Sequence, residues 1–355
     1  MWHKISLSRF RLMIQLTMLF LMVYGGSLVG YYAAEKISNA LPVLSCAYDK
    51  QTGGYCVLIP LQHQLHHRIG EALVAAQTFS LNVLLPLFFT LVSFFAFYVV
   101  LGKAFCGWVC PLGTVQELVG KLGRKLNIQP RFIAPEQLGK VRPIKWLMLL
   151  ALVLLFPLLA GMGVTPHATG DSFCQVCPSR IMTTVMTGDW EQLAISSADV
   201  TSTIFGVLAN LLFGFILLAA LAYRQPFCRG CPLLAWNSLF QHFSLMRLVK
   251  VEHSRCDKCS LCHQACPMDI PEIWREHGNK AFHEDCILCG RCAEFCPDDG
   301  VIHLQFAKWR WFSSARQYYK QRTKIENAKG ELKRVSIPVA QVQDALKEAV
   351  KKSDA

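Results

Sequence analysis

Two groups of four cysteines near the C-terminal end of the chain share one spacing, Cys-x2-Cys-x2-Cys-x3-Cys-Pro. Cysteines spaced in this way bind 4Fe-4S clusters: three thiolates wrap one cluster, and the fourth, before the proline, reaches across to the other cluster. The sequence therefore predicts two clusters. The ligands of the first are Cys256, Cys259, Cys262 and Cys296. The ligands of the second are Cys286, Cys289, Cys292 and Cys266.

Zinc sites and disulfides are the alternatives for these eight cysteines. Zinc ribbons pair two Cys-x2-Cys knuckles and do not require three close thiols with a fourth before proline, twice. Disulfides are rare in a reducing cytosol, so iron–sulfur binding is favoured. The segment VIHLQF after the second group fits a strand of the small ferredoxin fold. Gly290 suits a close backbone approach, whereas Asp285 and Glu294 are expected to be solvated surface charges.

Four further cysteines lie in two segments that begin with Phe-Cys and end with Cys-Pro, FCGWVCPLG and FCRGCPLLA. Each segment follows the end of a long apolar run, so both are expected at one membrane depth. They form a candidate third metal or redox site, in which Lys103 and Arg229 would lower the pKa of the thiols. Structural thiols at helix ends are the alternative. The ligands of this site would be Cys106, Cys110, Cys228 and Cys231.

The last four cysteines lie in segments that are predicted on the outer, oxidising side of the membrane: Cys46, Cys56, Cys174 and Cys177. Two structural disulfides are one interpretation, because disulfides persist on that side. The segment FCQVCP repeats the form of FCRGCP, so a second interpretation is a 4Fe-4S cluster or a thiophilic metal such as Cu(I). A redox-active dithiol is the third.

A histidine-rich segment, LQHQLHHRIGEAL, falls in the same predicted outer region. His63 and His67 are four residues apart and would share one face of a helix. Because histidine titrates near neutral pH, His63, His66 and His67 are candidate acceptors of the protons that quinol oxidation releases, and His167 has the same status. A solvated helix at the membrane interface is the alternative.

Long apolar segments must position these residues. The chain has 355 residues, of which 53% are hydrophobic, and a formal net charge of +12, so apolar and charged residues are segregated. Four windows reach or approach the roughly 20 apolar residues of a transmembrane helix. They are about Leu12–Ala34, Ser80–Gly102, Trp146–Gly163 and Thr201–Tyr223. The first is longer than the apolar part of a signal peptide and is expected to remain as an uncleaved span.

The distribution of Lys and Arg predicts the topology. The N-terminal leader and the segment after the second window are rich in Lys and Arg, whereas the segment after the third window has Arg180 beside four acidic residues. Short positive loops stay in the cytoplasm. We therefore expect a multi-pass protein of the bacterial inner membrane with both termini cytoplasmic. The charge is a topology signal, and nucleic acid is not expected as a partner.

These features resemble the membrane-bound polyferredoxins of the NapH and NosR type. The resemblance covers about residues 1–310 and is carried by FCGWVCPLGTVQEL, FCRGCPLLA and the two C-terminal cysteine groups. It implies an electron-transfer subunit of a quinol dehydrogenase or respiratory reductase system. The implied partners are membrane lipid, quinone, other subunits of a redox complex, and a periplasmic redox protein or cytochrome. The second Cys-Pro segment departs from the family pattern, with Cys-x2-Cys-Pro in place of Cys-x3-Cys-Pro.

CcoG-like proteins of oxidase assembly share the same elements more distantly. This second resemblance implies an alternative function, a copper-reducing or metallocentre-assembly factor that uses the same clusters. The direction of electron flow does not follow from the ligands, because cluster potentials span a wide range.

We therefore expect an α-helical integral membrane protein with four transmembrane helices and a C-terminal α+β ferredoxin-like domain with two clusters. An additional 4Fe-4S or copper site and a quinone are further candidate cofactors. The predicted divisions are a membrane domain (1–223), a Cys-Pro segment with linker (224–250), a ferredoxin domain (251–305), and an interfacial segment with a polar tail (306–355).

Overall fold

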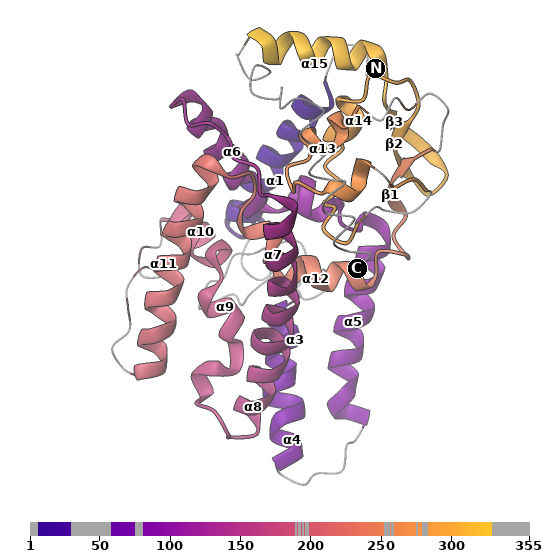
Figure 1. The fold of residues 1–355 in the computed structure, drawn as a ribbon. Helices are drawn as coiled ribbons and strands as arrows, with labels where there is room; N and C mark the ends of the chain where they lie inside the picture. Colours follow the sequence, from indigo (N-terminus) through magenta and orange to yellow (C-terminus); the bar gives the residue numbers. More distant parts are fainter. Residues whose placement is uncertain are drawn as a thin grey trace.

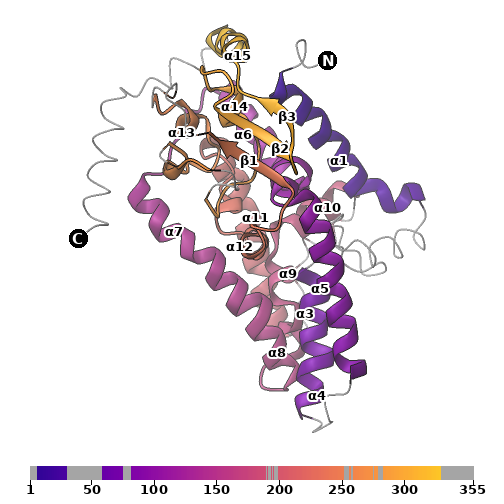
Figure 2. The ribbon, with the colours of Figure 1, turned by 90° about the vertical axis from the view of Figure 1, so that its right-hand side faces the viewer.

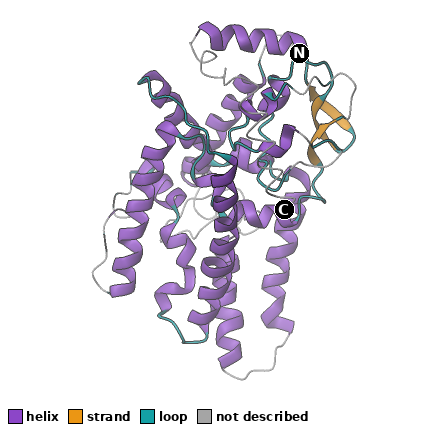
Figure 3. Cartoon of the chain, viewed as in Figure 1, coloured by secondary structure: helices purple, strands orange, loops and turns teal. Residues whose placement is uncertain are grey.

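The computed structural model describes residues 6–29, 58–74, 81–188, 199–251, 259–274, 276–278 and 283–328, and the single residues 190, 193, 195 and 256. Long helices extend towards one end of the molecule, and a small sheet with short helices forms the other end (Figure 1). Most of the described chain is helical, and the strands are confined to the sheet end (Figure 3).

The longest helices coincide with the predicted apolar windows. They are α1 (Leu7–Val29), α5 (Leu81–Leu101), α11 (Val200–Ala222), and a continuous helical run made of α7 (Pro135–Met148), η3 (Leu149–Leu155) and α8 (Phe156–Gly161). Three segments are long and apolar enough to cross a membrane: Leu7–Tyr24, Pro135–Gly161 and Val200–Ala222. Leu87–Leu101, within α5, is a shorter apolar helix. The run that begins at Pro135 is longer than the predicted third window, because the polar α7 continues into the apolar part without a break.

Shorter helices fill the space between the long ones. They are α3 (Leu58–Gln64), the π-helix η1 (Leu65–Gly70), α4 (Glu71–Val74), α6 (Pro111–Lys125), α9 (Ser172–Val176), α10 (Pro178–Met186) and α12 (Pro232–Leu239). The histidine-rich segment, for which a solvated interfacial helix was one interpretation, packs one face against α5 and α8 (Figure 2). Leu58 and Leu61 are buried, and a Cβ on Gly70 would lie 2.6 Å from Gly161 Cα. The two glycines therefore allow backbone contact between η1 and α8.

The sheet has three antiparallel strands in the order β1 (Met246–Lys250), β2 (Ile302–Phe306) and β3 (Trp309–Ser313). Leu304 of β2 pairs with Leu248 and Phe312, and all three side chains are buried. The segment VIHLQF thus supplies the central strand. The short helices beside the sheet are α13 (Leu261–Ala265), η7 (Pro271–Trp274) and α14 (Arg291–Glu294), and α15 (Arg316–Ala328) follows β3. Strand β3 extends the sheet beyond residue 305, where the sequence placed the end of the ferredoxin domain.

Ion pairs join the helical part to the sheet part, and in each pair the cation comes from the helical part. Lys145 pairs with Asp285 and with Glu284, the latter at 2.7 Å. Arg142 forms two bonds of 2.7 Å to Glu272. Lys145 and Asp285 are buried, so Asp285 is not the solvated surface charge that the sequence led us to expect.

Two further contacts between the parts, one ion pair and one hydrogen bond, involve buried acidic groups. Arg229 donates to Asp269 at 2.7 Å, and both side chains are buried. Glu294, the second expected surface charge, is buried and accepts a hydrogen bond from Ser8 Oγ of α1. The two parts are therefore docked through desolvated charges, which requires each charge to keep its partner.

A further ion pair fixes α1 against α6. Arg11 Nη2 lies 2.6 Å from Glu117 Oε2, and the Arg11 side chain is 2% exposed. Burial alone would raise the pKa of Glu117, but the charges of Arg11, Arg291 and Lys121 and a hydrogen bond from Gln15 together outweigh burial and lower that pKa to about 2. A depressed carboxyl pKa contributes stability that is complete above the ordinary value near 4.5 and is lost as the pH falls through about 2.

At pH 7, Glu117→Gln should therefore lower the free energy of unfolding by about 3–5 kcal/mol, because it leaves the Arg11 guanidinium buried without a counter-charge. The measurement is chemical unfolding of the full chain in detergent. Lys121→Gln is the matched control: Lys121 also pairs with Glu117, but at 3.8 Å and half-exposed, so its loss should cost less than about 1 kcal/mol. Equal losses in the two variants would contradict the buried pair.

Candidate metal centres

The eight cysteines of the two C-terminal groups line two separate cavities. One, of about 310 Å³, is lined by Cys256, Cys259, Cys262 and Cys296 among other residues. The other, of about 290 Å³, is lined by Cys266, Cys286, Cys289 and Cys292. Cys266 and Cys296, which precede the prolines, each line the cavity that is formed by the first three cysteines of the other group. This is the crossed arrangement expected for a protein with two clusters.

The local backbone explains how each group curls around its cavity. Ser260 and Gly290 precede α13 and α14 and both have left-handed conformations, with φ of 60° and 74°. Glycine adopts this region without strain. A Cβ on Gly290 would lie 2.7 Å from Leu304 Cδ1, so the turn also requires a residue without a side chain. The approach of the Gly290 backbone to a cluster, which the sequence indicated, stays a prediction.

The chemistry of the donor sets fits iron–sulfur clusters. Burial raises the pKa of Cys262 to about 12 and that of Cys286 to about 11. Such thiols stay protonated at neutral pH unless a metal supplies compensating positive charge, and a coordinating thiol is deprotonated by its metal. Four thiols around each cavity, all buried in the second and two of them half-buried in the first, provide the donor set of a 4Fe-4S cluster.

The second of these cysteine groups lies directly on the first membrane-side Cys-Pro segment. The π-helix η2 (Phe105–Val109) contains Gly107, where a Cβ would lie 2.3 Å from the Ile287 carbonyl oxygen. Trp108 Nε1 donates to the Leu288 carbonyl oxygen at 2.9 Å. The loop from Cys286 to Cys289 is therefore in backbone contact with the segment that carries Cys106.

The structure brings the two Cys-Pro segments together as a third cysteine cluster. Cys110 and Cys231 are the N-cap residues of α6 and α12, each followed by proline at the first helical position. Cys228 lies in the turn η6 (Phe227–Arg229). Gln116 of α6 accepts a hydrogen bond from the Phe227 backbone N–H at 3.1 Å and donates to Cys228 Sγ at 3.8 Å. Both segments are thus held by one glutamine.

The pKa of these thiols is raised, not lowered as the sequence predicted. Burial raises the pKa of Cys106 to about 11 and that of Cys228 to about 12. Lys103 and Arg229 do act in the predicted direction, but burial outweighs them. The expectation from nearby cations was wrong because it left out desolvation, which disfavours the thiolate.

Lys103 lies between the membrane-side cysteines and the ferredoxin-like part. Its Nζ donates to the Glu284 carbonyl oxygen at 2.6 Å and to Gln241 Oε1 at 2.7 Å. Burial lowers the pKa of Lys103 to about 8, and both Cys286 and Cys106 raise it. The Lys103 ammonium group therefore lies near both Cys106 of the Cys-Pro segments and Cys286 of the ferredoxin-like part.

Cys174 and Cys177 were expected in an outer loop. They lie instead on either side of the end of α9, which packs on α11 and η3 in the body of the bundle (Figure 2). Cys174 is 5% exposed and, within the described residues, forms no disulfide. Cys46 and Cys56, grouped with this pair in the sequence, lie outside the described residues.

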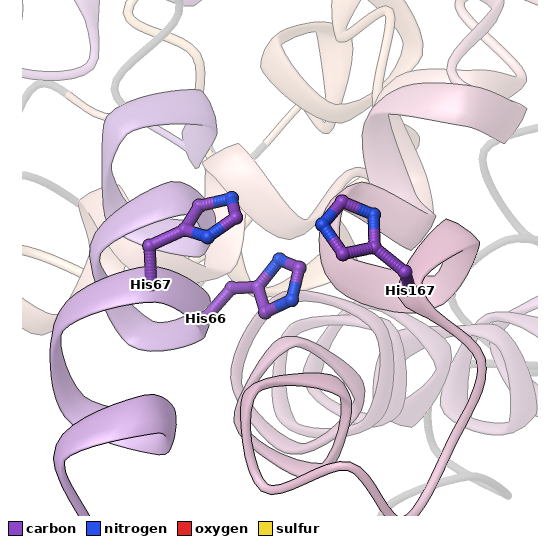
Figure 4. Close-up of side chains that lie close together, drawn as sticks. All are labelled: His66, His67 and His167. Atoms are coloured by element: carbon purple, nitrogen blue, oxygen red, sulfur yellow. The ribbon is translucent and has the colours of Figure 1, made fainter.

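Three histidines form a compact group near the end of the bundle that is remote from the sheet (Figure 4). The π-helix η1 presents His66 and His67, and the turn η4 (His167–Asp171) presents His167. Their nearest ring nitrogens lie within 4.8 Å of one another. His67 Nδ1 lies 2.8 Å from Glu71 Oε1, which orients the ring. His63 is adjacent, with its ring centroid 4.4 Å from that of His67.

Several residues of these sites carry no signal in the sequence alone. Gln116 and Gly107 lie within the segment FCGWVCPLGTVQEL, but their roles come from contacts with residues more than a hundred positions away, which the motif does not indicate. Two of the sites lie on π-helices, which often mark functional positions. The sequence around Pro60, near the start of α3, did not predict the π-helix that begins at Leu65.

Comparisons with known proteins agree with this chemistry. The family model described as "4Fe-4S binding domain" matches residues 83–129, which include Cys106 and Cys110. The model described as "4Fe-4S dicluster domain" matches residues 248–304, which include all eight cysteines of the C-terminal groups. No solved structure matches the chain.

The curated relatives include proteins named as ferredoxin-type, electron-transport and regulatory proteins. The ferredoxin-type protein NapH of Haemophilus influenzae is 30% identical over 57% of this chain and 62% of its own length. The putative electron transport protein YccM of Escherichia coli is 27% identical over 61% of this chain and 55% of its own length. The regulatory protein NosR of Pseudomonas aeruginosa is 27% identical over 60% of this chain and 27% of its own length. The chain spans less than two thirds of each of these three.

Gly107→Ala should separate the Cys286–Cys289 loop from η2, because the new Cβ would meet the Ile287 carbonyl oxygen at 2.3 Å. We expect a loss of about 1–3 kcal/mol of stability and faster hydrogen exchange of the loop amides, measured on the full chain by mass spectrometry. Gly139→Ala is the control, since nothing lies within 4 Å of its Cβ. Unchanged exchange in Gly107→Ala would show that the two parts are not docked at this point.

Proposed function

Since the chain is a NapH/NosR-like polyferredoxin with 4Fe-4S-binding domains, we propose that it is a membrane-bound iron–sulfur electron carrier. It links the quinone pool, or a cytoplasmic donor, to a periplasmic redox protein or cytochrome. In this role it is the electron-transfer subunit of a quinol dehydrogenase or respiratory reductase system. The protein lies in the inner membrane with both termini in the cytoplasm.

One observation carries this proposal: the second ferredoxin-like cysteine group is in backbone contact with the Cys-Pro segment at the end of α5. Gly107 leaves no room between the two, and Trp108 bonds across the contact. Cys106 and Cys286 are both close enough to Lys103 to influence its pKa. Electrons held by the cluster on Cys286 would therefore pass to the membrane-side cysteines over a short distance.

The clusters, when bound, supply one-electron chemistry, and the residues around them tune it. The positive charge of Lys103 favours the reduced form of its neighbours. Burial of the cysteine sets lowers the local dielectric constant and strengthens that effect. The protein thus sets potentials through burial and charge, as expected where the redox chemistry belongs to the cofactor.

The histidines near the remote end have the proton-accepting role that the sequence indicated. Quinol oxidation releases protons together with electrons. Burial, and then neighbouring positive groups, lower the pKa of His63 and His66, so both rings are neutral at pH 7 and would pass on an accepted proton and not retain it. His67 Nδ1 is held by Glu71 at 2.8 Å, which fixes the orientation of its ring beside the other histidines.

The proposal predicts electron exchange between the ferredoxin clusters and a membrane quinone through the third cysteine cluster. In nanodiscs, menaquinone should reoxidise clusters that have been reduced with dithionite. Each quinone takes up two electrons, one at a time, and two protons to form the quinol. Cys106→Ser/Cys231→Ser should slow this at least about tenfold, because it removes the intermediate site without touching the ferredoxin ligands. Stopped-flow absorbance in the visible range follows the clusters.

Direct oxidation by ferricyanide serves as the control in this experiment. It should proceed equally fast in the variant, since the ferredoxin-like part remains open to the aqueous phase. Equal rates with menaquinone in the wild type and the variant would rule out the membrane-side cysteines as the route.

The histidine group favours a second candidate function, reduction or insertion of copper. Imidazole nitrogens suit Cu(II), and His66, His67 and His167 place their ligand atoms within 4.8 Å of one another. One electron from a reduced cluster would convert one bound Cu(II) to Cu(I). This function would need no quinone.

Under the copper hypothesis the full chain should bind one Cu(II) with nitrogen hyperfine structure in its electron paramagnetic resonance spectrum. His167→Gln should weaken binding at least about tenfold, because one of three ligands is lost. His242→Gln, which changes an exposed histidine elsewhere, should have no effect. Wild-type protein that binds no copper, or His167→Gln that binds it normally, would remove this candidate.

A further inference from the structure

The glutamine that organises the third cysteine cluster has a counterpart elsewhere in the bundle. Gln116 of α6 donates to the carbonyl oxygen of Leu112 and accepts the backbone N–H of Phe227. Gln62 of α3 makes the same two bonds: its Nε2 donates to the Leu58 carbonyl oxygen at 2.9 Å, and its Oε1 accepts the Phe173 N–H at 3.2 Å. In both cases 111 residues separate the glutamine from the phenylalanine.

Each glutamine also donates to the sulfur of the cysteine that follows that phenylalanine. Gln62 Nε2 lies 3.0 Å from Cys174 Sγ, and Gln116 Nε2 lies 3.8 Å from Cys228 Sγ, with 112 residues between the partners in both pairs. Two hydrogen-bond networks with the same atoms and the same sequence intervals do not arise from one local motif. They indicate that the membrane part contains an internal repeat.

The backbone around the cysteines repeats as well. Cys177 and Cys231 have φ of −71° and −69° and ψ of 119° and 122°, and each is the N-cap of a helix whose first residue is proline. The surrounding helices correspond: η1 packs on α8, and α6 packs on α11. A glycine brings each helix pair into contact, since a Cβ on Gly161 would lie 2.1 Å from the His66 carbonyl oxygen, and one on Gly123 would lie 2.2 Å from that of Leu221.

The two copies extend towards opposite ends of the molecule. α3 and α4 lie towards the end remote from the sheet, whereas α6 lies towards the sheet (Figure 1). This is the arrangement of an inverted repeat, in which sites form where the two copies meet. The pair Cys174 and Cys177 therefore occupies, in its own repeat, the position that Cys228 and Cys231 occupy in the other.

The two positions are also neighbours in space. Burial raises the pKa of Cys231, and Cys228, Cys106 and Cys177 raise it further. Cys177 is thus close enough to Cys231 to act on its charge. In the sequence, Cys56 precedes Gln62 by the same interval by which Cys110 precedes Gln116, but Cys56 lies outside the described residues.

We propose that Cys174 and Cys177 are ligands of a further iron–sulfur cluster, held in a second site equivalent by internal symmetry to the cluster of Cys-Pro cysteines beside the ferredoxin-like part. The family match to residues 83–129 assigns iron–sulfur binding to the segment with Cys106 and Cys110, and no match extends to Cys174 or Cys177. This inference concerns cluster content alone. It holds or fails independently of the donor, the acceptor and the direction of electron flow.

The test is iron and acid-labile sulfide per chain in the full-length protein, purified without oxygen. Cys174→Ser/Cys177→Ser should lose about four irons and four sulfides relative to the wild type. The magnetic resonance signals of the ferredoxin clusters should remain, which reports that the variant is folded. Cys228→Ser/Cys231→Ser is the matched variant of the equivalent site and should lose the same amount.

A milder variant keeps both cysteines. Gln62→Leu removes the hydrogen bond to Cys174 Sγ and should change the spectrum or potential of one cluster only, the cluster that is missing from Cys174→Ser/Cys177→Ser. Gln116→Leu should change a different one. If the two glutamine variants left all cluster signals unaltered, the proposed equivalence would be wrong.

Three results would overturn the proposal. The first is an iron content that is unchanged in the folded double-cysteine variant. The second is loss of zinc or copper in place of iron, which would mean a mononuclear site. The third is a disulfide that involves Cys174 or Cys177, detected by mass spectrometry of protein alkylated under denaturing conditions without reductant.

Discussion

Pairing of buried charges determines where the cysteine groups lie relative to one another. Lys145, Arg142 and Arg229 project from the helical part and meet Asp285, Glu272 and Asp269 close to the cysteine loops. A desolvated charge that loses its partner destabilises the protein. Because any other placement of the ferredoxin-like part would separate these pairs, they fix its orientation on the bundle. This docking places the Cys286–Cys289 loop against Gly107. The cysteines of the ferredoxin-like part and those of the Cys-Pro segments are therefore neighbours.

The sequence was sufficient for features that depend on local spacing. The two Cys-x2-Cys-x2-Cys-x3-Cys-Pro groups are short loops, so their pattern contains nearly all the information about which thiols share a cavity. The apolar windows followed from composition, because a long run without charge has few alternatives to a buried or membrane-spanning helix. The central strand followed from the position of VIHLQF directly after the second cysteine group, where the small ferredoxin fold has a strand.

The sequence was insufficient where position depends on distant partners. Lys103 and Lys145 look like topology signals in a basic segment, yet both are buried against the ferredoxin-like part. Asp285 and Glu294 look like surface residues because the groups that bury them, Lys145 and Ser8, are far away in the chain. The segment FCQVCP resembles an exposed loop between two spans, but α9 folds back into the bundle. In each case the deciding contact crosses more than a hundred residues, and no single-sequence pattern encodes it.

The opposed orientation of the two repeats has an evolutionary consequence. Two copies of one unit that face opposite ends match the product of gene duplication in an ancestor that inserted into the membrane in both directions and paired with itself. Such a pair would have carried two identical metal sites related by a twofold axis in the membrane plane. Fusion freed the copies to diverge, and the ferredoxin-like part now docks against Lys103 and Gly107 of one copy. A symmetric ancestor could transfer electrons equally well in either direction across the membrane. The added ferredoxin-like part made the two ends of the molecule different.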